Sequence, residues 1–189
     1  MKKLFTKFDE FFINIINDRI KNPFLDVFFY RYTFLGGATF ITVVTVLMIV
    51  LGTDSGFRRL GLDALISQLL VGVVVQSLKK VFARERPYKI LESLNTFGIN
   101  MRDYSFPSGH TAASFSLALI FSINYPYLTI PMFIYAFLIG VSRIYLGVHY
   151  PTDVMAGFII GLIMSTIGHT FAFPMAIDWM RRIYFMING

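Results

Sequence analysis

Ionisable side chains gather in three short stretches of a chain that is otherwise strongly apolar. The stretches run from Lys79 to Pro87, from Pro107 to His110 and from Ser142 to Asp153. They contain three cations that each offer several hydrogen-bond donors, namely Lys79, Arg86 and Arg143. Such donors suit an anion that carries several oxygen atoms. The three stretches therefore predict an anion-binding site.

The second stretch opens a predicted helix, and the first free N–H groups of a helix favour a phosphate. That phosphate would lie against Ser108 and Gly109. His110 and His149 can divide the roles of nucleophile and acid–base catalyst. Asp153 lies four residues after His149, where it can hold one ring nitrogen as N–H and leave the other lone pair directed at phosphorus. These residues favour phosphoryl transfer through a phosphohistidine.

Each stretch also has a purely structural interpretation. Lys79 and Arg86 could be cations that reach the membrane surface from a helix end. Ser108 could serve only to begin a helix, and His149 with Asp153 could be a structural hydrogen-bonded pair. We prefer the functional interpretation because all three stretches carry chemistry that fits one anion.

Nothing in the composition suggests a metal or a cofactor. The two histidines and few carboxylates of the three stretches are a poor ligand set for a dinuclear centre, and the chain has no cysteine. We therefore expect the chemistry to be independent of metals and cofactors.

The elements that position these residues are expected to be membrane helices. Of the 189 residues, 56% are hydrophobic and only 15% are charged, and the mean hydropathy is +0.63. This composition excludes a disordered chain, a coiled coil and a small secreted scaffold. A net charge of +6 could indicate nucleic acid, anionic lipid or an anionic substrate, and the apolar chain favours the last two. No nucleic-acid partner is expected.

Charge-poor windows of about 20 residues predict the spanning helices. Together they predict an all-α, polytopic membrane helix bundle of about five spans, with six as the alternative, in a single domain over residues 1–189. The predicted spans are Tyr32 to Leu51, Ala64 to Leu78 with an extension to Phe82, 108–123, 127–147, and Val154 to Ile177.

The two ends of the chain differ from the spans. Apolar residues from Phe5 to Ile20 recur at helical spacing, and the intervening charges, among them Asp9, are expected on the opposite, solvated face. This pattern predicts an amphipathic helix in the membrane interface. The tail around Trp179 is expected to be an interfacial anchor. His169 is expected to hydrogen bond between helices, and Gly157 with Gly161 to allow close helix packing.

Topology predicts that the three stretches meet. One loop joins spans two and three, and another joins spans four and five, so both loops lie on the same side if spans three and four each cross once. The catalytic candidates would then face one another at one membrane surface. Other cations near them are expected to contact loops or lipid headgroups, namely Lys80, Arg84, Lys89 and Arg102.

The three stretches resemble the three-part signature of the type 2 phosphatidic acid phosphatases. Lys79 is followed after six residues by Arg86-Pro87, then by Pro107-Ser108-Gly109-His110, then by Ser142-Arg143, His149 and Asp153. The resemblance implies that His149 is the nucleophile, that Asp153 orients it, and that His110 protonates the leaving oxygen and later activates water. It implies phosphoryl contacts for the remaining positions, which are Lys79, Arg86, Ser108, Gly109 and Arg143. Many members have six spans, and here the amphipathic N-terminal segment takes the place of the first.

The expected function is hydrolysis of a phosphomonoester or pyrophosphate on a membrane lipid. Candidate substrates are undecaprenyl pyrophosphate, phosphatidylglycerophosphate and phosphatidate. The alternative is a lipid flippase or channel that binds the phosphate headgroup without hydrolysis, although such a protein would not require both His149 and Asp153. A vanadate-dependent haloperoxidase is disfavoured by the spans. The resemblance implies a site that faces outward from the cytoplasmic membrane, whereas the distribution of basic residues does not decide the orientation.

Overall fold

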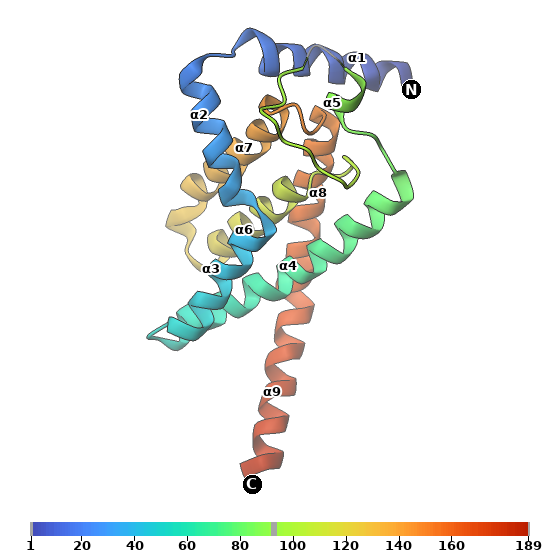
Figure 1. Ribbon diagram of the computed structural model, residues 1–189. Coiled ribbons are helices and arrows are strands. Elements are labelled where there is room, and N and C mark those ends of the chain that lie inside the picture. Colours follow the sequence, from blue (N-terminus) through green and yellow to red (C-terminus); the bar gives the residue numbers. More distant parts are fainter. Residues whose placement is uncertain (1, 92–93, 189) are drawn as a thin grey trace.

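The computed structural model describes residues 2–91 and 94–188, with side chains from residue 7 onward. The described chain is a bundle of helices, with one helix lying across one end and another extending from the opposite end (Figure 1). The α-helices are α1 (Lys2–Ile13), α2 (Pro23–Tyr32), α3 (Ala38–Leu51), α4 (Ser55–Phe82), α5 (Pro87–Ile90), α6 (Gly109–Asn124), α7 (Thr129–Tyr145), α8 (Pro151–Ile167) and α9 (Phe173–Asn188). Four short 3-10 or π segments join them: Asn14–Arg19, Thr33–Gly36, Pro126–Leu128 and Gly168–Ala172.

The helices are long and apolar enough for a multi-pass membrane protein, which confirms the predicted fold class. Three stretches in the described chain could cross a membrane by length and composition, Ser55–Ile90, Pro126–Tyr145 and Pro151–Asn188. A fourth is possible if the bent pair Pro23–Gly36 and Ala38–Leu51 counts as one span. All five predicted segments are helical, but α6 has only 16 residues, fewer than the roughly 20 that a span needs. The predicted count of five is therefore only roughly supported.

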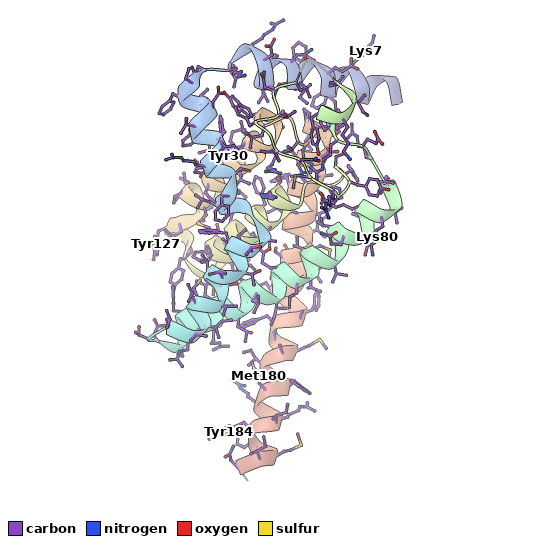
Figure 2. The ribbon with its side chains drawn as sticks, viewed as in Figure 1. Lys7, Tyr30, Lys80, Tyr127, Met180 and Tyr184 are labelled. Atoms are coloured by element: carbon purple, nitrogen blue, oxygen red, sulfur yellow. The ribbon has the colours of Figure 1, made fainter. Side chains whose placement is uncertain are left out.

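The first and last predicted spans have different boundaries from those expected. The chain bends by 53° between Pro23–Gly36 and Ala38–Leu51, instead of running straight from Tyr32. Gly36 lies so close to α7 that a Cβ there would come within 2.4 Å of Ile139, so the bend brings backbone against a neighbouring helix. At the other end, helix continues past Ile177 to Asn188. The side chains of Met180 and Tyr184 project from this extension into open space (Figure 2).

The N-terminal segment is helical, as predicted, but buries a different face. Phe8, Phe11 and Phe12 are exposed, whereas Asp9 is only 1% exposed. The prediction that Asp9 lies on a solvated face is therefore wrong. A buried carboxylate is tolerated when it is well hydrogen bonded, and Asp9 has partners in Arg84 and Thr152. The side chain of Phe5 lies outside what the structure describes.

The centre of the bundle is α6, which packs against α4, α7 and α8. Its buried face is made mostly of alanine and serine, and these small side chains let the neighbouring backbones approach closely. A Cβ at Gly157 would lie 2.6 Å from the Ser108 carbonyl, and one at Gly161 would lie 2.5 Å from that of Ala112. These contacts confirm that the two glycines serve helix packing. They also fix the start of α6, which carries His110, against α8.

His169 forms the interhelical hydrogen bond that the sequence predicted. Its Nδ1 lies 2.6 Å from Oδ2 of Asp63 on α4. Asp63 and His169 lie outside the three stretches described above, and neither side chain lines the site cavity. The pair therefore fixes the segment Gly168–Ala172, which follows α8, to α4.

Candidate active site

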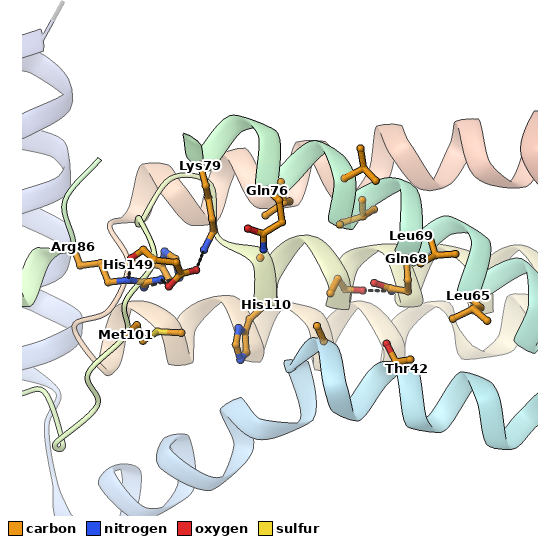
Figure 3. Close-up of a pocket in the computed structure, with 18 residues that line it drawn as sticks. Thr42, Leu65, Gln68, Leu69, Gln76, Lys79, Arg86, Met101, His110 and His149 are labelled. Atoms are coloured by element: carbon orange, nitrogen blue, oxygen red, sulfur yellow. Dashed lines mark hydrogen bonds and ion pairs between the residues drawn. The ribbon is translucent and has the colours of Figure 1, made fainter. Parts of the chain in front are cut away.

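The fold brings the three stretches together at the end of the bundle that α1 covers, as the topology argument predicted. Lys79 comes from the last turn of α4 and Arg143 from the last turn of α7. Gly109 and His110 begin α6, and His149 lies in the loop between α7 and α8. A cavity of about 610 Å³ is lined by Lys79, Arg86, Gly109, His110 and His149 (Figure 3).

Arg86 is the most completely bonded side chain of the site. It is 1% exposed, and all five of its N–H groups have partners. Nε donates to the carbonyl of Asp103, Nη1 to the carbonyl of Val148 and to His149, and Nη2 to the carboxylate of Asp103 and the carbonyl of Tyr104. The guanidinium is thereby fixed beside the imidazole of His149.

His149 is buried and its Nε2 faces Arg86. The distance from Arg86 Nη1 to His149 Nε2 is 3.2 Å. Because a guanidinium can only donate, Nε2 accepts this bond and the ring proton lies on Nδ1. Burial and the positive charges of Arg143 and Arg86 hold the pKa of His149 well below its ordinary value of 6.5. The ring is therefore neutral near pH 7, with its lone pair toward the cations.

Asp153 lies close to His149 without a hydrogen bond to it. The separation of His149 Nδ1 from Asp153 Oδ2 is 3.6 Å, which is longer than a hydrogen bond. Instead, Oδ2 accepts from the backbone N–H of Tyr150 at 2.9 Å, and Oδ1 accepts from Arg84 at 2.7 Å. Among the described residues Nδ1 of His149 has no hydrogen-bond partner. The orienting role of Asp153 stays a prediction.

Arg84 differs from what the sequence predicted. Rather than contacting a loop or a headgroup, its guanidinium bridges Asp153 and Asp9, both at 2.7 Å, and stacks 3.8 Å from the ring centre of Tyr150. No pattern in the sequence indicates these partners, since Asp9 and Asp153 lie far apart in the chain.

Ser108 is buried, and its groups bond within the protein. Its N–H donates to the carbonyl of Asp153 at 3.0 Å, and its hydroxyl lies 2.8 Å from that of Thr111. Gly109 and His110, by contrast, line the cavity. The first turn of α6 therefore offers a phosphoryl group the N–H groups that follow Ser108, in accordance with the orphan donors of a helix start.

Arg143 lies on the other side of His110, in a neighbouring cavity of about 550 Å³. It is 2% exposed; its Nη1 donates to Thr33 at 2.7 Å, and its Nη2 lies 3.4 Å from the sulfur of Met101. Its Nε has no partner among the described residues. His110 and Met101 line both cavities, so Arg143 lies beside the same histidine as the cations of the larger cavity.

Asp103 is the site residue that sequence reasoning missed. Its carboxylate pairs with Lys79 and with Arg86, and it lines the cavity. Burial alone would raise the pKa of Asp103, but the hydrogen bond and charge of Lys79 and the charge of Arg86 lower it to about 2. The carboxylate is therefore ionised near pH 7. The only sequence feature that could have pointed to Asp103 is its place in the loop that precedes Pro107.

The residues that could bind a metal do not converge in the part of the chain that the structure describes. No group of three or more histidine and acidic side chains has the arrangement of a metal site there. The independence from metals stays a prediction.

The fold and the site define a multi-pass helical membrane protein with a buried cationic cluster around a histidine. Residues 60–175, which include all the predicted site residues, match the model of the PAP2 superfamily. The chain belongs to that superfamily, as the resemblance of its three stretches predicted.

Individual relatives agree with this assignment. The chain is 31% identical over 160 residues to phosphatidylglycerophosphatase B of Bacillus subtilis, covering 77% of this chain and 74% of the relative. It is 33% identical over 105 residues to an undecaprenyl-diphosphatase of Sulfolobus acidocaldarius, a match that spans 55% of this chain and only 51% of that relative. The crystal structure of Aquifex aeolicus LpxE has a TM-score of 0.74 and 34% identity, covering 85% of this chain and 93% of that one.

Proposed function

We propose that the protein is a membrane lipid phosphatase that hydrolyses a lipid phosphomonoester or pyrophosphate through a phosphohistidine at His149. The observation that carries the proposal is the position of His149 Nε2, buried and 3.2 Å from Arg86, in a cavity that also contains Lys79 and His110. The names of the relatives support it, because they are phosphatases of lipids or of polyprenyl diphosphates.

The proposed first step is attack of His149 Nε2 on phosphorus. The N–P bond forms as the bond from phosphorus to the leaving oxygen breaks, and His110 gives that oxygen a proton. Lys79, Arg86 and Arg143, with the N–H groups at Gly109, stabilise the charge on the phosphoryl oxygens. In the second step His110 takes a proton from water, the hydroxyl attacks phosphorus, and the N–P bond breaks. Inorganic phosphate leaves and His149 is neutral again.

A lipid substrate is supported by the walls of the cavity. From the cations the cavity continues between α3 and α4, along Ala38, Thr42, Leu65, Leu69 and Val73 (Figure 3). Leu69 and Val73 are 63% and 67% exposed, so the cavity opens sideways, toward the acyl or prenyl chains of a bilayer. The proposed candidate substrates include undecaprenyl pyrophosphate, phosphatidylglycerophosphate and phosphatidate.

The proposal includes a single catalytic domain over residues 1–189 in the cytoplasmic membrane, with its site facing outward. Single-cysteine variants at Asn100, on the loop of the site, and at Ser55, at the start of α4, test the orientation. Both positions are exposed. A membrane-impermeant thiol reagent should label Asn100→Cys but not Ser55→Cys in intact cells, and the reverse pattern would show that the site faces the cytoplasm.

The activity is tested by phosphate release from the detergent-purified protein with each of the three lipids, in the presence of EDTA. Release should persist under chelation and disappear in His149→Ala. His169→Gln, which changes a histidine outside the cavity, is the matched control. Absence of release from every lipid by folded wild-type protein would contradict the proposal and favour a binding or transport role. Release that EDTA abolishes would contradict the metal-free mechanism.

A further inference from the structure

Asp103 lies among the cations to which the proposed function assigns the phosphoryl group. One of its carboxylate oxygens accepts from Arg86 Nη2 at 2.7 Å, and the other pairs with Lys79 Nζ. The side chain of Asp103 is 43% exposed, whereas those of Arg86 and Lys79 are 0% and 7% exposed. The carboxylate therefore covers two buried cations from the accessible side.

Arg86 has no spare donor for a phosphoryl oxygen. Three of its five bonds go to backbone carbonyls, which the fold holds in place, and a fourth goes to His149. The fifth goes to the carboxylate of Asp103, which is the one partner on a rotatable and exposed side chain. A phosphoryl oxygen can thus reach Arg86 by replacing that carboxylate, in addition to the Nη1 donor that His149 releases when its Nε2 attacks phosphorus.

The backbone around Asp103 is held, so that the side chain can move alone. The N–H and carbonyl of Met101 bond to the hydroxyl of Tyr88 at 3.0 and 3.1 Å. Ser105 donates to the carbonyl of Arg84 at 2.8 Å. Between these anchors Arg102, Asp103 and Tyr104 are exposed. A rotation about the side-chain bonds of Asp103 is enough to vacate the two cations without unfolding the loop.

We infer that Asp103 is an affinity-determining residue, an internal anion that competes with the phosphoryl group for Lys79 and Arg86. It moves aside when a substrate binds and takes the two cations back as inorganic phosphate leaves. This inference rests on the proposed function, since it assumes that the cluster binds phosphate. Two neighbouring anions repel each other, so a carboxylate that stays on Lys79 and Arg86 weakens the binding of the phosphoryl group to these cations.

The test compares Asp103→Asn with wild-type protein, with inorganic phosphate as the probe. Asparagine keeps the shape of the side chain and removes its charge. The constant for competitive inhibition by inorganic phosphate should fall by about tenfold, and KM for the lipid should fall with it. Asp103→Glu, which keeps the charge, should stay near the wild-type value. Glu85→Gln removes an exposed charge near the same end of the bundle and should leave inhibition unchanged.

Inhibition by phosphate that is unchanged or weaker in Asp103→Asn would overturn the inference, and so would an equal effect in Glu85→Gln. If Asp103→Asn does not purify as a folded protein, Asp103→Ser carries the same test. The rise in melting temperature with added phosphate gives a second measurement that does not depend on turnover. Wild-type protein that neither binds phosphate nor releases it from lipid would defeat the proposed function. Normal wild-type behaviour without an effect of Asp103→Asn would defeat this inference alone.

Discussion

Arg84 donates to Oδ1 of Asp153 at 2.7 Å, while the oxygen nearer to His149 accepts from the backbone N–H of Tyr150. The carboxylate next to the proposed nucleophile is therefore held from two sides by groups that do not belong to the three-part signature. Through Arg84 it is also connected to Asp9 on the N-terminal helix. The position of Asp153 thus depends on a helix far from it in sequence.

We expect Arg84→Ala to lower kcat by about tenfold with little change in KM, because Arg84 acts on the position of Asp153 and does not line the cavity. Steady-state kinetics with the preferred lipid will separate the two constants. Arg84→Lys should recover part of the activity. The exposed neighbour Lys80 provides the control, and Lys80→Ala should behave as wild type. A change in KM alone would contradict a positioning role.

Asp9→Asn is expected to lower the free energy of unfolding by about 1 to 3 kcal/mol, because it weakens three hydrogen bonds to a buried carboxylate. These bonds come from Arg84, the N–H of Thr152 and the hydroxyl of Thr152. Thermal unfolding in detergent measures the effect. Glu10→Gln, on the exposed side of the same helix, should leave the melting temperature unchanged. Equal melting temperatures for the two variants would show that Asp9 is not a structural contact.

The acid limb of kcat/KM should lie below pH 6.5. Burial, followed by the charges of Arg143 and Arg86, lowers the pKa of His149 from its ordinary 6.5, and the nucleophile must be neutral. Activity is therefore present above the lowered pKa and lost as the pH falls through it. Arg143→Gln removes one of these charges and should move the limb to higher pH, although its rate will be low. A limb above pH 6.5, or one that Arg143→Gln leaves in place, would contradict this account.

Gly157→Ala should destabilise the protein and reduce its activity. The added Cβ would lie 2.6 Å from the carbonyl of Ser108, so the start of α6 must shift, and His110 with it. The expected loss of unfolding free energy is about 1 to 3 kcal/mol. Gly72→Ala is the matched control, since a Cβ there meets nothing within 4 Å and alanine favours helix. Its melting temperature should be unchanged or higher, and a similar loss in both variants would contradict the packing argument.

The sequence predicted the helical membrane fold and the meeting of the three stretches because both follow from local signals. Charge-free windows define helices, and loop parity places helix ends on one side. The bend before α3 was not predictable, because the need for glycine at position 36 arises from its contact with Ile139 of α7. The buried position of Asp9 was missed for a similar reason. The amphipathic pattern of the N-terminal helix is equally suited to a membrane surface and to the end of a helix bundle.

The same distinction between local sequence signals and contacts across elements applies to the site residues. The residues at fixed spacing, such as Lys79, Arg86 and His149, could be selected from their motif. Asp103 and Arg84 could not, because their importance lies in contacts with residues from other elements. The 3.6 Å gap between His149 and Asp153 also escaped the sequence, since helical spacing of four residues gives proximity but not bond direction.

The sideways opening of the cavity between α3 and α4 has a consequence for how the enzyme would meet its substrate. For a molecule that enters from the bilayer, the concentration that sets the rate is its amount per unit of membrane area, not its amount per volume of water. The rate should therefore follow the mole fraction of the lipid in a vesicle or mixed micelle, and adding more vesicles of the same composition should leave the turnover of each bound enzyme molecule unchanged. A water-soluble ester of the same phosphate would have to compete without that local enrichment.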